Sequence, residues 1–159
     1  MNHNIYSDDR LRGIFDKVRT IAMVGASPNW NRPSYFVMKY LQLKGFRVIP
    51  VNPRAAGEIV LGEKVHSSLD QVPDAIDMVD VFRSSKEALG ITEQAIAKGA
   101  KVIWMQIGIS NNKAANLAEK AGLVVVMNRC PKIEYSRLNG ELSWGGFNSG
   151  IISSKRRRI

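Results

Sequence analysis

Five short apolar runs alternate along this chain with longer segments whose apolar residues recur at helical spacing. Short apolar runs bounded by turn-forming residues are typical of buried strands, and strands that alternate with helices are typical of a parallel sheet. Because helices then cover both faces, each strand is expected to be almost wholly apolar. The pattern predicts an α/β fold with a Rossmann-like, doubly wound parallel sheet of five strands in the order 3-2-1-4-5. The predicted strands are Ile21–Val24, Arg47–Val51, Ala75–Phe82, Lys101–Ile107 and Leu123–Met127.

The predicted helices lie between these strands, with one more at each end of the domain. An amphipathic helix over Asp8–Val18 precedes the first strand. The others run over Pro33–Lys44, from Ser85 to Gly99, from Ser110 or Asn111 to Gly122, and from Pro131 toward Arg137.

The segment from the first strand into the next helix has the features of an anion site. Gly25 and Ala26 would let a phosphate approach the backbone, Ser27 and Ser34 carry hydroxyls, and Arg32 carries a positive charge. The free N–H groups and the dipole of a helix N-terminus favour a negative group there. The alternative is a tight turn that binds no ligand.

This segment departs from the dinucleotide fingerprint G-x-G-x-x-G. Only Gly25 is present, because Ser27 and Trp30 stand where the second and third glycines belong. The departure weakens an assignment to NAD.

The end of the second strand reads Asn52-Pro53-Arg54, with no acidic residue for ribose hydroxyls. An arginine at this place suits an extra phosphate near the ribose, as found in NADP and in the 3′-phosphate of coenzyme A (CoA). The alternative is a solvent-facing turn residue. Polar or special residues also end the other strands, and the sequence predicts a ligand crevice at the carboxyl ends of strands one and four.

Composition limits the remaining classes. A chain of 159 residues fits one domain, with no apolar run of membrane length and no signal-peptide pattern at its start. A single cysteine, Cys130, excludes an internal disulfide and fits a cytoplasmic protein. The net charge of +9 suggests an anionic partner, either a phosphorylated small molecule or a nucleic acid, although no nucleic-acid-binding motif is present.

Two features stay open at this level. Cys130 precedes Pro131 at a helix start, where its thiol could face the crevice with a lowered pKa and form a mixed disulfide with CoA; we favour the alternative, a buried small side chain. Residues 138–159 are rich in glycine and serine but contain Trp144 and Phe147. We expect this extension to pack on the domain of residues 1–137 or on a second subunit of a homo-oligomer, with its basic end frayed.

Several pieces of the chain together resemble the small bacterial CoA-binding proteins. They are Val24–Ser27 with Arg32–Ser34, Val51–Pro53, Val79–Arg83, Trp104–Gly108 and Asn128–Pro131. That family is similar to the CoA-binding domain of the succinyl-CoA synthetase α subunit.

The resemblance implies that CoA lies over the carboxyl ends of the strands. Its phosphates would meet Gly25, Ala26, Ser27, Arg32 and Ser34, and its ribose phosphate would meet the turn Asn52, Pro53 and Arg54. Further contacts are implied for Phe82, Arg83, Met105, Gln106 and Ile107. The synthetase carries its phosphohistidine in another domain, and neither His3 nor His66 matches it.

The resulting hypothesis is a protein that binds CoA or an acyl-CoA, without a recognisable catalytic residue or metal ligand. An NAD(P)-binding oxidoreductase or redox sensor is the second hypothesis, and a nucleic-acid-binding protein is the third. Neither a membrane nor a nucleic acid is expected as a partner.

Overall fold

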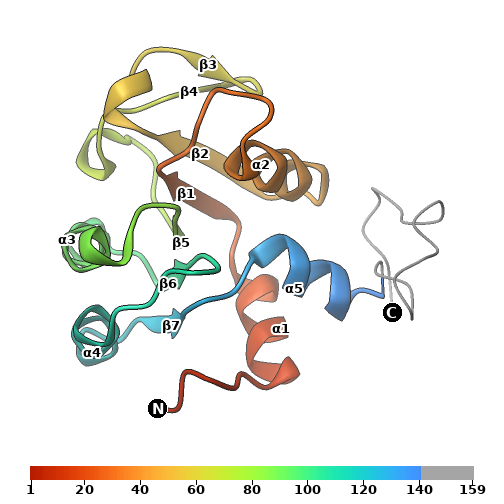
Figure 1. Ribbon diagram of the computed structural model, residues 1–159, viewed down its shortest axis with the longest axis vertical. Coiled ribbons are helices and arrows are strands. Elements are labelled where there is room, and N and C mark those ends of the chain that lie inside the picture. Colours follow the sequence, from red (N-terminus) through yellow and green to blue (C-terminus); the bar gives the residue numbers. More distant parts are fainter. Residues whose placement is uncertain (141–159) are drawn as a thin grey trace.

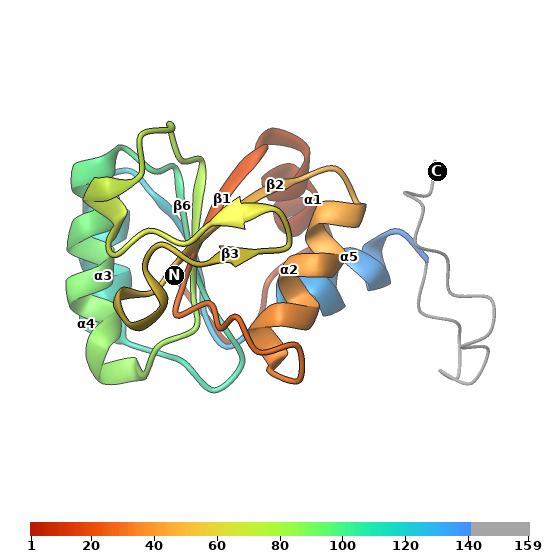
Figure 2. The ribbon, with the colours of Figure 1, turned by 90° about the horizontal axis from the view of Figure 1, so that it is seen from above.

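The fold is known from a computed structural model, which describes residues 1–140. Five parallel strands form one sheet, with α1, α2 and α5 on one face and α3 and α4 on the other (Figures 1 and 2). The elements are α1 (Asp8–Lys17), β1 (Thr20–Val24), α2 (Pro33–Leu43), β2 (Arg47–Val51), η1 (Pro53–Ala55), β3 (Ile59–Val60), β4 (Glu63–Lys64), η2 (Leu69–Gln71), β5 (Met78–Val81), α3 (Ser85–Lys98), β6 (Val102–Met105), α4 (Asn112–Lys120), β7 (Val124–Val126) and α5 (Pro131–Leu138). The predicted α/β, Rossmann-like class with a five-stranded parallel sheet is confirmed.

The strand order is β2-β1-β5-β6-β7. Outside β2, His66 forms one parallel bridge with Val51, so the segment after the β3–β4 hairpin occupies the third place of a 3-2-1-4-5 pattern. The predicted strand Ala75–Phe82 was expected at that place, and this detail is wrong, because β5 pairs with β1. The segment around His66 already pairs with the end of β2, so the next regular strand, β5, pairs on the other side of β1.

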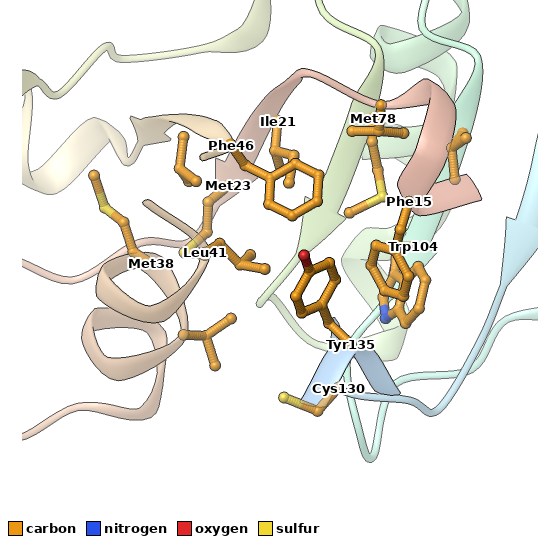
Figure 3. Close-up of a cluster of buried hydrophobic side chains, with 14 of the residues drawn as sticks. Phe15, Ile21, Met23, Met38, Leu41, Phe46, Met78, Trp104, Cys130 and Tyr135 are labelled. Atoms are coloured by element: carbon orange, nitrogen blue, oxygen red, sulfur yellow. The ribbon is translucent and has the colours of Figure 1, made fainter. Parts of the chain in front are cut away.

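The face under α1, α2 and α5 is packed with aromatic side chains. The Phe15 ring lies 5.5 Å from that of Trp104 and 5.3 Å from that of Tyr135, and Tyr135 is 5.6 Å from Phe46 (Figure 3). The indole N–H of Trp104 donates to the carbonyl oxygen of Arg129 at 2.9 Å, which satisfies its polar atom inside the core.

The opposite face is aliphatic. The buried residues that α3 and α4 turn toward the sheet are mostly alanines, namely Ala88, Ala95, Ala114, Ala115 and Ala118, with Ile91 and Thr92. Small side chains let these helices lie close to the apolar strands, so this layer is dense without aromatic residues.

The described residues contain no helix long and apolar enough to cross a membrane. Trp144 and Phe147, for which packing was expected, lie outside the described residues.

Candidate functional site

The carboxyl ends of β1, β2 and β5 are joined by backbone hydrogen bonds. The N–H of Gly25 donates to Val51 O at 2.8 Å, and the N–H of Phe82 donates to Val24 O at 2.8 Å. The loops after these three strands therefore begin side by side. The neighbours of β1 are β2 and β5, so the predicted fourth strand, β6, does not lie beside β1 as the expected crevice required.

Gly25 is required at this junction. Its φ is +94°, and a Cβ there would lie 2.9 Å from both Phe82 O and Arg83 Cδ. Both the left-handed backbone and the contact with the neighbouring loop exclude a side chain, so the β1 loop can pass directly over the end of β5.

The loop that follows Gly25 is tied to the start of α2. The N–H of Ser27 donates to the Ser34 hydroxyl at 2.9 Å, and the N–H of Asn29 donates to the Ser27 hydroxyl at 3.1 Å. Ser34 is buried, so its hydroxyl holds the loop rather than facing solvent. Arg32 occupies the N-cap position of α2, makes no capping hydrogen bond with its side chain, and is followed by Pro33 at the first helical position. The N-terminus of α2 is thus left without a side-chain cap.

The turn after β2 is organised by Asn52. Its amide Nδ2 donates to Ala26 O at 2.8 Å, and its Oδ1 accepts from the N–H of Arg54 at 3.0 Å. The Asn52 side chain therefore links the β1 and β2 loops and sets the start of η1.

Two predicted cations stand exposed beside this junction. Arg32 lies at the start of α2 and Arg54 in η1, and neither forms an ion pair with any of residues 1–140. An exposed guanidinium without a carboxylate partner can form charge-assisted, bidentate bonds with a phosphate.

Arg83 is arranged differently. Its guanidinium donates to both carboxylate oxygens of Glu87, at 2.7 and 3.2 Å. The same carboxylate accepts from the N–H and the hydroxyl of Ser84, and these partners lower the pKa of Glu87 to about 2. Arg83 is therefore already paired, and its charge is largely offset.

The other residues that were predicted to contact CoA differ in how far they are exposed. Phe82 is partly buried, while Ile107 is 55% exposed at the end of β6. Met105 is fully buried in the aliphatic layer, so its side chain does not reach the edge. Gln106 is also buried, and its amide oxygen has no hydrogen-bond partner.

Three residues of this edge were not predicted as site residues. Trp30, noted only as a departure from a motif, is 72% exposed in the loop before α2. Asn128 has a φ of +56°, and its Oδ1 accepts from the N–H of Gly108 at 2.7 Å. Asp80 is fully buried in the central strand without a hydrogen bond. A charged residue inside an apolar strand was the signal that could have identified Asp80.

The thiol of Cys130 is buried, which agrees with the favoured alternative. Burial raises the pKa of Cys130, outweighing the lowering by the backbone N–H groups of Ile133 and Lys132. The idea of a lowered pKa at a helix start is wrong for this residue, because desolvation of the thiolate is the larger effect.

A polar cavity of about 430 Å³ lies beside the loops that follow β6 and β7. Its walls come from the N-terminal residues Met1–Asn4 and from Ser110, Asn112, Met127, Asn128 and Arg129. The N-terminal segment is held there because Arg129 donates to Asn4 O at 2.7 Å and Met127 N–H donates to the Tyr6 hydroxyl at 2.8 Å. Among residues 1–140, no group of acidic, histidine or cysteine side chains could hold a metal ion.

The fold is Rossmann-like, and one edge of its parallel sheet combines a glycine turn, a helix N-terminus without a side-chain cap and arginines without ion-pair partners, which are features that favour an anion. The family is shown by comparison: residues 19–136 match the model of the CoA binding domain, and the chain belongs to that family. The resemblance seen in the sequence is thereby confirmed.

The chain is also similar to other proteins along most of their length. The chain is 35% identical over 130 residues to uncharacterized protein YneT of Bacillus subtilis, covering 82% of this chain and 95% of that protein. A solved structure of a hypothetical protein from Pyrococcus horikoshii superposes with a TM-score of 0.80 and 44% identity, over 84% and 92% of the two chains.

The chain is also similar to a much larger protein, the ADP-forming acetate–CoA ligase II of Archaeoglobus fulgidus. The identity is 29% over 155 residues, which is 94% of this chain but 21% of the ligase. The similarity therefore covers one domain of that enzyme.

Proposed function

We propose that this protein binds CoA or an acyl-CoA at the carboxyl edge of β1, β2 and β5, and that binding is its principal function. The pyrophosphate would lie at the Gly25–Ser27 loop, facing the N-terminus of α2 and Arg32. The 3′-phosphate of the ribose would lie at Arg54. Family membership supports CoA as the ligand class, and the residues at the edge fit its charges.

The observation that carries the proposal is the open N-terminus of α2 beside two unpaired arginines. Gly25 lets the loop lie directly against the end of β5, and Asn52 fixes the distance between the β1 and β2 loops. An anion placed there gains backbone N–H donors, the helix dipole and charge-assisted bonds together.

Catalysis is not part of the proposal. Among the described residues of this edge, Arg32 and Arg54 are exposed cations without an ion-pair partner, and they suit the binding of an anion rather than a chemical step. The acetate–CoA ligase relative carries its activity in a chain of which this domain is about a fifth.

The decisive experiment compares CoA with dephospho-CoA by calorimetric titration at one salt concentration. We expect CoA to bind about ten- to a hundredfold more tightly, because a hydrogen bond to a charged group contributes about 1.5–3 kcal/mol. Arg54→Ala should remove most of that difference. Arg12→Ala, which replaces another exposed arginine on α1, should keep it.

The same calorimetric titration is carried out with NAD and with NADP. Tight NADP binding without CoA binding would refute the proposal. Equal affinity for CoA and dephospho-CoA would keep the ligand class and exclude Arg54 from the site.

A further inference from the structure

Three buried polar side chains lie together beneath the carboxyl edge, and the proposed CoA site does not use two of them. Asp80 is 0% exposed, and neither carboxylate oxygen has a hydrogen-bond partner. Gln106 is 8% exposed, and its Oε1 has none. Cys130 is 5% exposed and receives a hydrogen bond from the Gln106 side chain.

The sheet register brings these groups to the same face. Asp80 of β5 pairs with Trp104 of β6, and Gln106 follows Trp104 by two residues, on the same side of the strand. The N–H of Gln106 donates to Val81 O at 3.2 Å, beside Asp80. The Trp104 indole bonds Arg129 O, which places Cys130 over this face as well (Figure 3). A charge on Asp80 would raise the pKa of the Cys130 thiol, so the two side chains lie within electrostatic reach of each other.

The two unpartnered groups complement each other in one protonation state. A carboxylate and an amide oxygen are both acceptors and repel each other, whereas a protonated carboxyl group is a donor. Each buried group left without a partner costs free energy, so a bond between them removes two such costs at once.

We propose that Asp80 is a neutral, protonated acid that donates its O–H to Oε1 of Gln106, directly or through one water, and thereby positions the β6 turn for CoA binding. This inference rests on the proposed function. Ionisation of Asp80 would force Gln106 to rotate. Gln106 opens the turn in which Ile109 N–H bonds Gln106 O at 2.9 Å, and this turn carries the exposed Ile107 at the edge.

The surroundings favour the neutral form. Burial raises the pKa of Asp80 well above its usual value, and no charged side chain of the described residues offsets it. Its neighbours in the sheet, Met23 of β1 and Trp104 of β6, carry no charge. The helix layer packed on this face contributes the titratable groups Cys130, Tyr135, Tyr40 and Lys44, and burial also holds the Cys130 thiol neutral.

Ligand binding and protonation are coupled in this arrangement. Phosphates bound above this position would disfavour a carboxylate further. CoA binding and protonation of Asp80 therefore favour each other, as linkage requires.

The test measures CoA affinity from pH 6.5 to 9.5 for the wild type, Asp80→Asn, Gln106→Leu and the surface control Asp16→Asn. The amide that Asp80→Asn introduces is uncharged at every pH, so this variant keeps a donor toward Gln106 throughout. Relative to Asp80→Asn, the CoA affinity of the wild type should fall as Asp80 ionises. The fall should be about tenfold for each unit by which bound CoA raises the pKa of Asp80.

The Gln106→Leu variant loses the acceptor, so its affinity should be weaker than that of the wild type at low pH and depend less on pH. Asp16→Asn should reproduce the wild-type profile, because Asp16 is an exposed residue of α1. The phosphates and the thiol of CoA ionise in the same way whichever variant is present. Comparing the variants at each pH therefore removes the effect of CoA ionisation on the measured affinity.

A second measurement reads the fold alone. The folded pKa of Asp80 is raised, so ionisation is penalised in the folded protein once the pH exceeds the unfolded value of about 3.9. The wild type should therefore lose stability to urea, relative to Asp80→Asn, as the pH rises from about 4 through the folded pKa, and the difference should then level off. Should the variant fail to fold, the carboxyl ¹³C shift of Asp80 in the wild type decides the matter, with the protonated value expected at pH 7.

Parallel pH profiles of CoA affinity in the wild type and Asp80→Asn would overturn the inference while leaving CoA binding intact. An ionised Asp80 at pH 7 would overturn it as well. If no variant binds CoA at any pH, the proposed function fails, and the urea and NMR measurements still show whether Asp80 is the donor to Gln106.

Discussion

Two helices begin at the same edge of the sheet, after the neighbouring strands β1 and β5, and their N-termini are treated in opposite ways. At α3, the Glu87 carboxylate accepts from the N–H and the hydroxyl of Ser84. At α2, the first turn has no acidic residue, and the N-cap residue Arg32 is itself a cation. A helix N-terminus favours a negative group, so α3 supplies its own anion and α2 leaves that place to a ligand.

The comparison explains why one loop of this edge is the proposed phosphate site and the adjacent loop is not. Arg83 and Glu87 neutralise each other beside α3, whereas Arg32 has no ion-pair partner among residues 1–140. Positive potential therefore remains at α2. Each of the following substitutions changes one side of this contrast.

The largest effect is expected from Gly25→Ala, which alters the loop that leads to α2. The positive φ costs about 1–3 kcal/mol for a residue with a side chain, and the 2.9 Å contact with Phe82 O adds to that cost. Gly57→Ala is the matched control, because Gly57 has a φ of +89° but nothing within 4 Å of a Cβ. Urea unfolding and CoA titration should show a greater loss for Gly25→Ala in both measurements. Equal losses in the two variants would show that the contact with the β5 loop is unimportant.

A smaller effect is expected when α2 is given its own carboxylate. Tyr35 lies three residues after the N-cap Arg32, as Glu87 lies three residues after Ser84. Tyr35→Glu should weaken CoA binding by roughly fivefold, since a charge at a helix N-terminus is worth up to about 1 kcal/mol. Tyr35→Gln has a similar shape without the charge and should bind more tightly than Tyr35→Glu in the same titration. If the two variants bind alike, the open N-terminus of α2 is not where the ligand's charge lies.

The smallest effect is expected from Glu87→Gln, which removes the negative charge at the N-terminus of α3. The pair with Arg83 is exposed to solvent, so the loss of stability should stay below about 1 kcal/mol. The pKa of Glu87 is lowered to about 2, so its contribution is present above the unfolded value of about 4.3 and is lost as the pH falls toward 2. Glu93→Gln, at an exposed position of the same helix, is the matched control and should cost less stability in urea unfolding than Glu87→Gln. A loss that grows above neutral pH would contradict the assigned pKa shift.

The local elements followed from the sequence with little error. Arg47–Val51 has the predicted bounds, and α2 begins at Pro33 and ends one residue before the predicted Lys44. Apolar runs, proline at a helix start and glycine after a helix end are local signals, so they can be read without knowledge of the rest of the chain. The strands predicted over 75–82 and 101–107 are shorter, Met78–Val81 and Val102–Met105, because apolar residues such as Ile76, Phe82 and Ile107 lie just outside the paired segments.

The candidate site was predicted in part. Arg32 and Arg54 are exposed and unpaired, as an anion site needs. Arg83 is paired with Glu87, and Met105 points into the aliphatic layer. The spacing of residues shows neither of these outcomes. The pairing of Arg83 depends on which carboxylate lies near it, and the burial of Met105 depends on which face of the strand is turned inward.

The sequence by itself determined the class of fold, the glycine turn after β1 and the set of loops that meet at one edge. Those features depend on short-range periodicity and on backbone preferences of single residues, which the chain carries locally. The tertiary structure alone decided that β5 lies beside β1, that the N-terminus of α2 has no side-chain cap while that of α3 has one, and that Asp80 and Gln106 are buried with oxygen atoms that lack hydrogen-bond partners. Strand neighbours and buried side-chain partners arise from contacts between residues far apart in the chain, where packing and desolvation outweigh local preference.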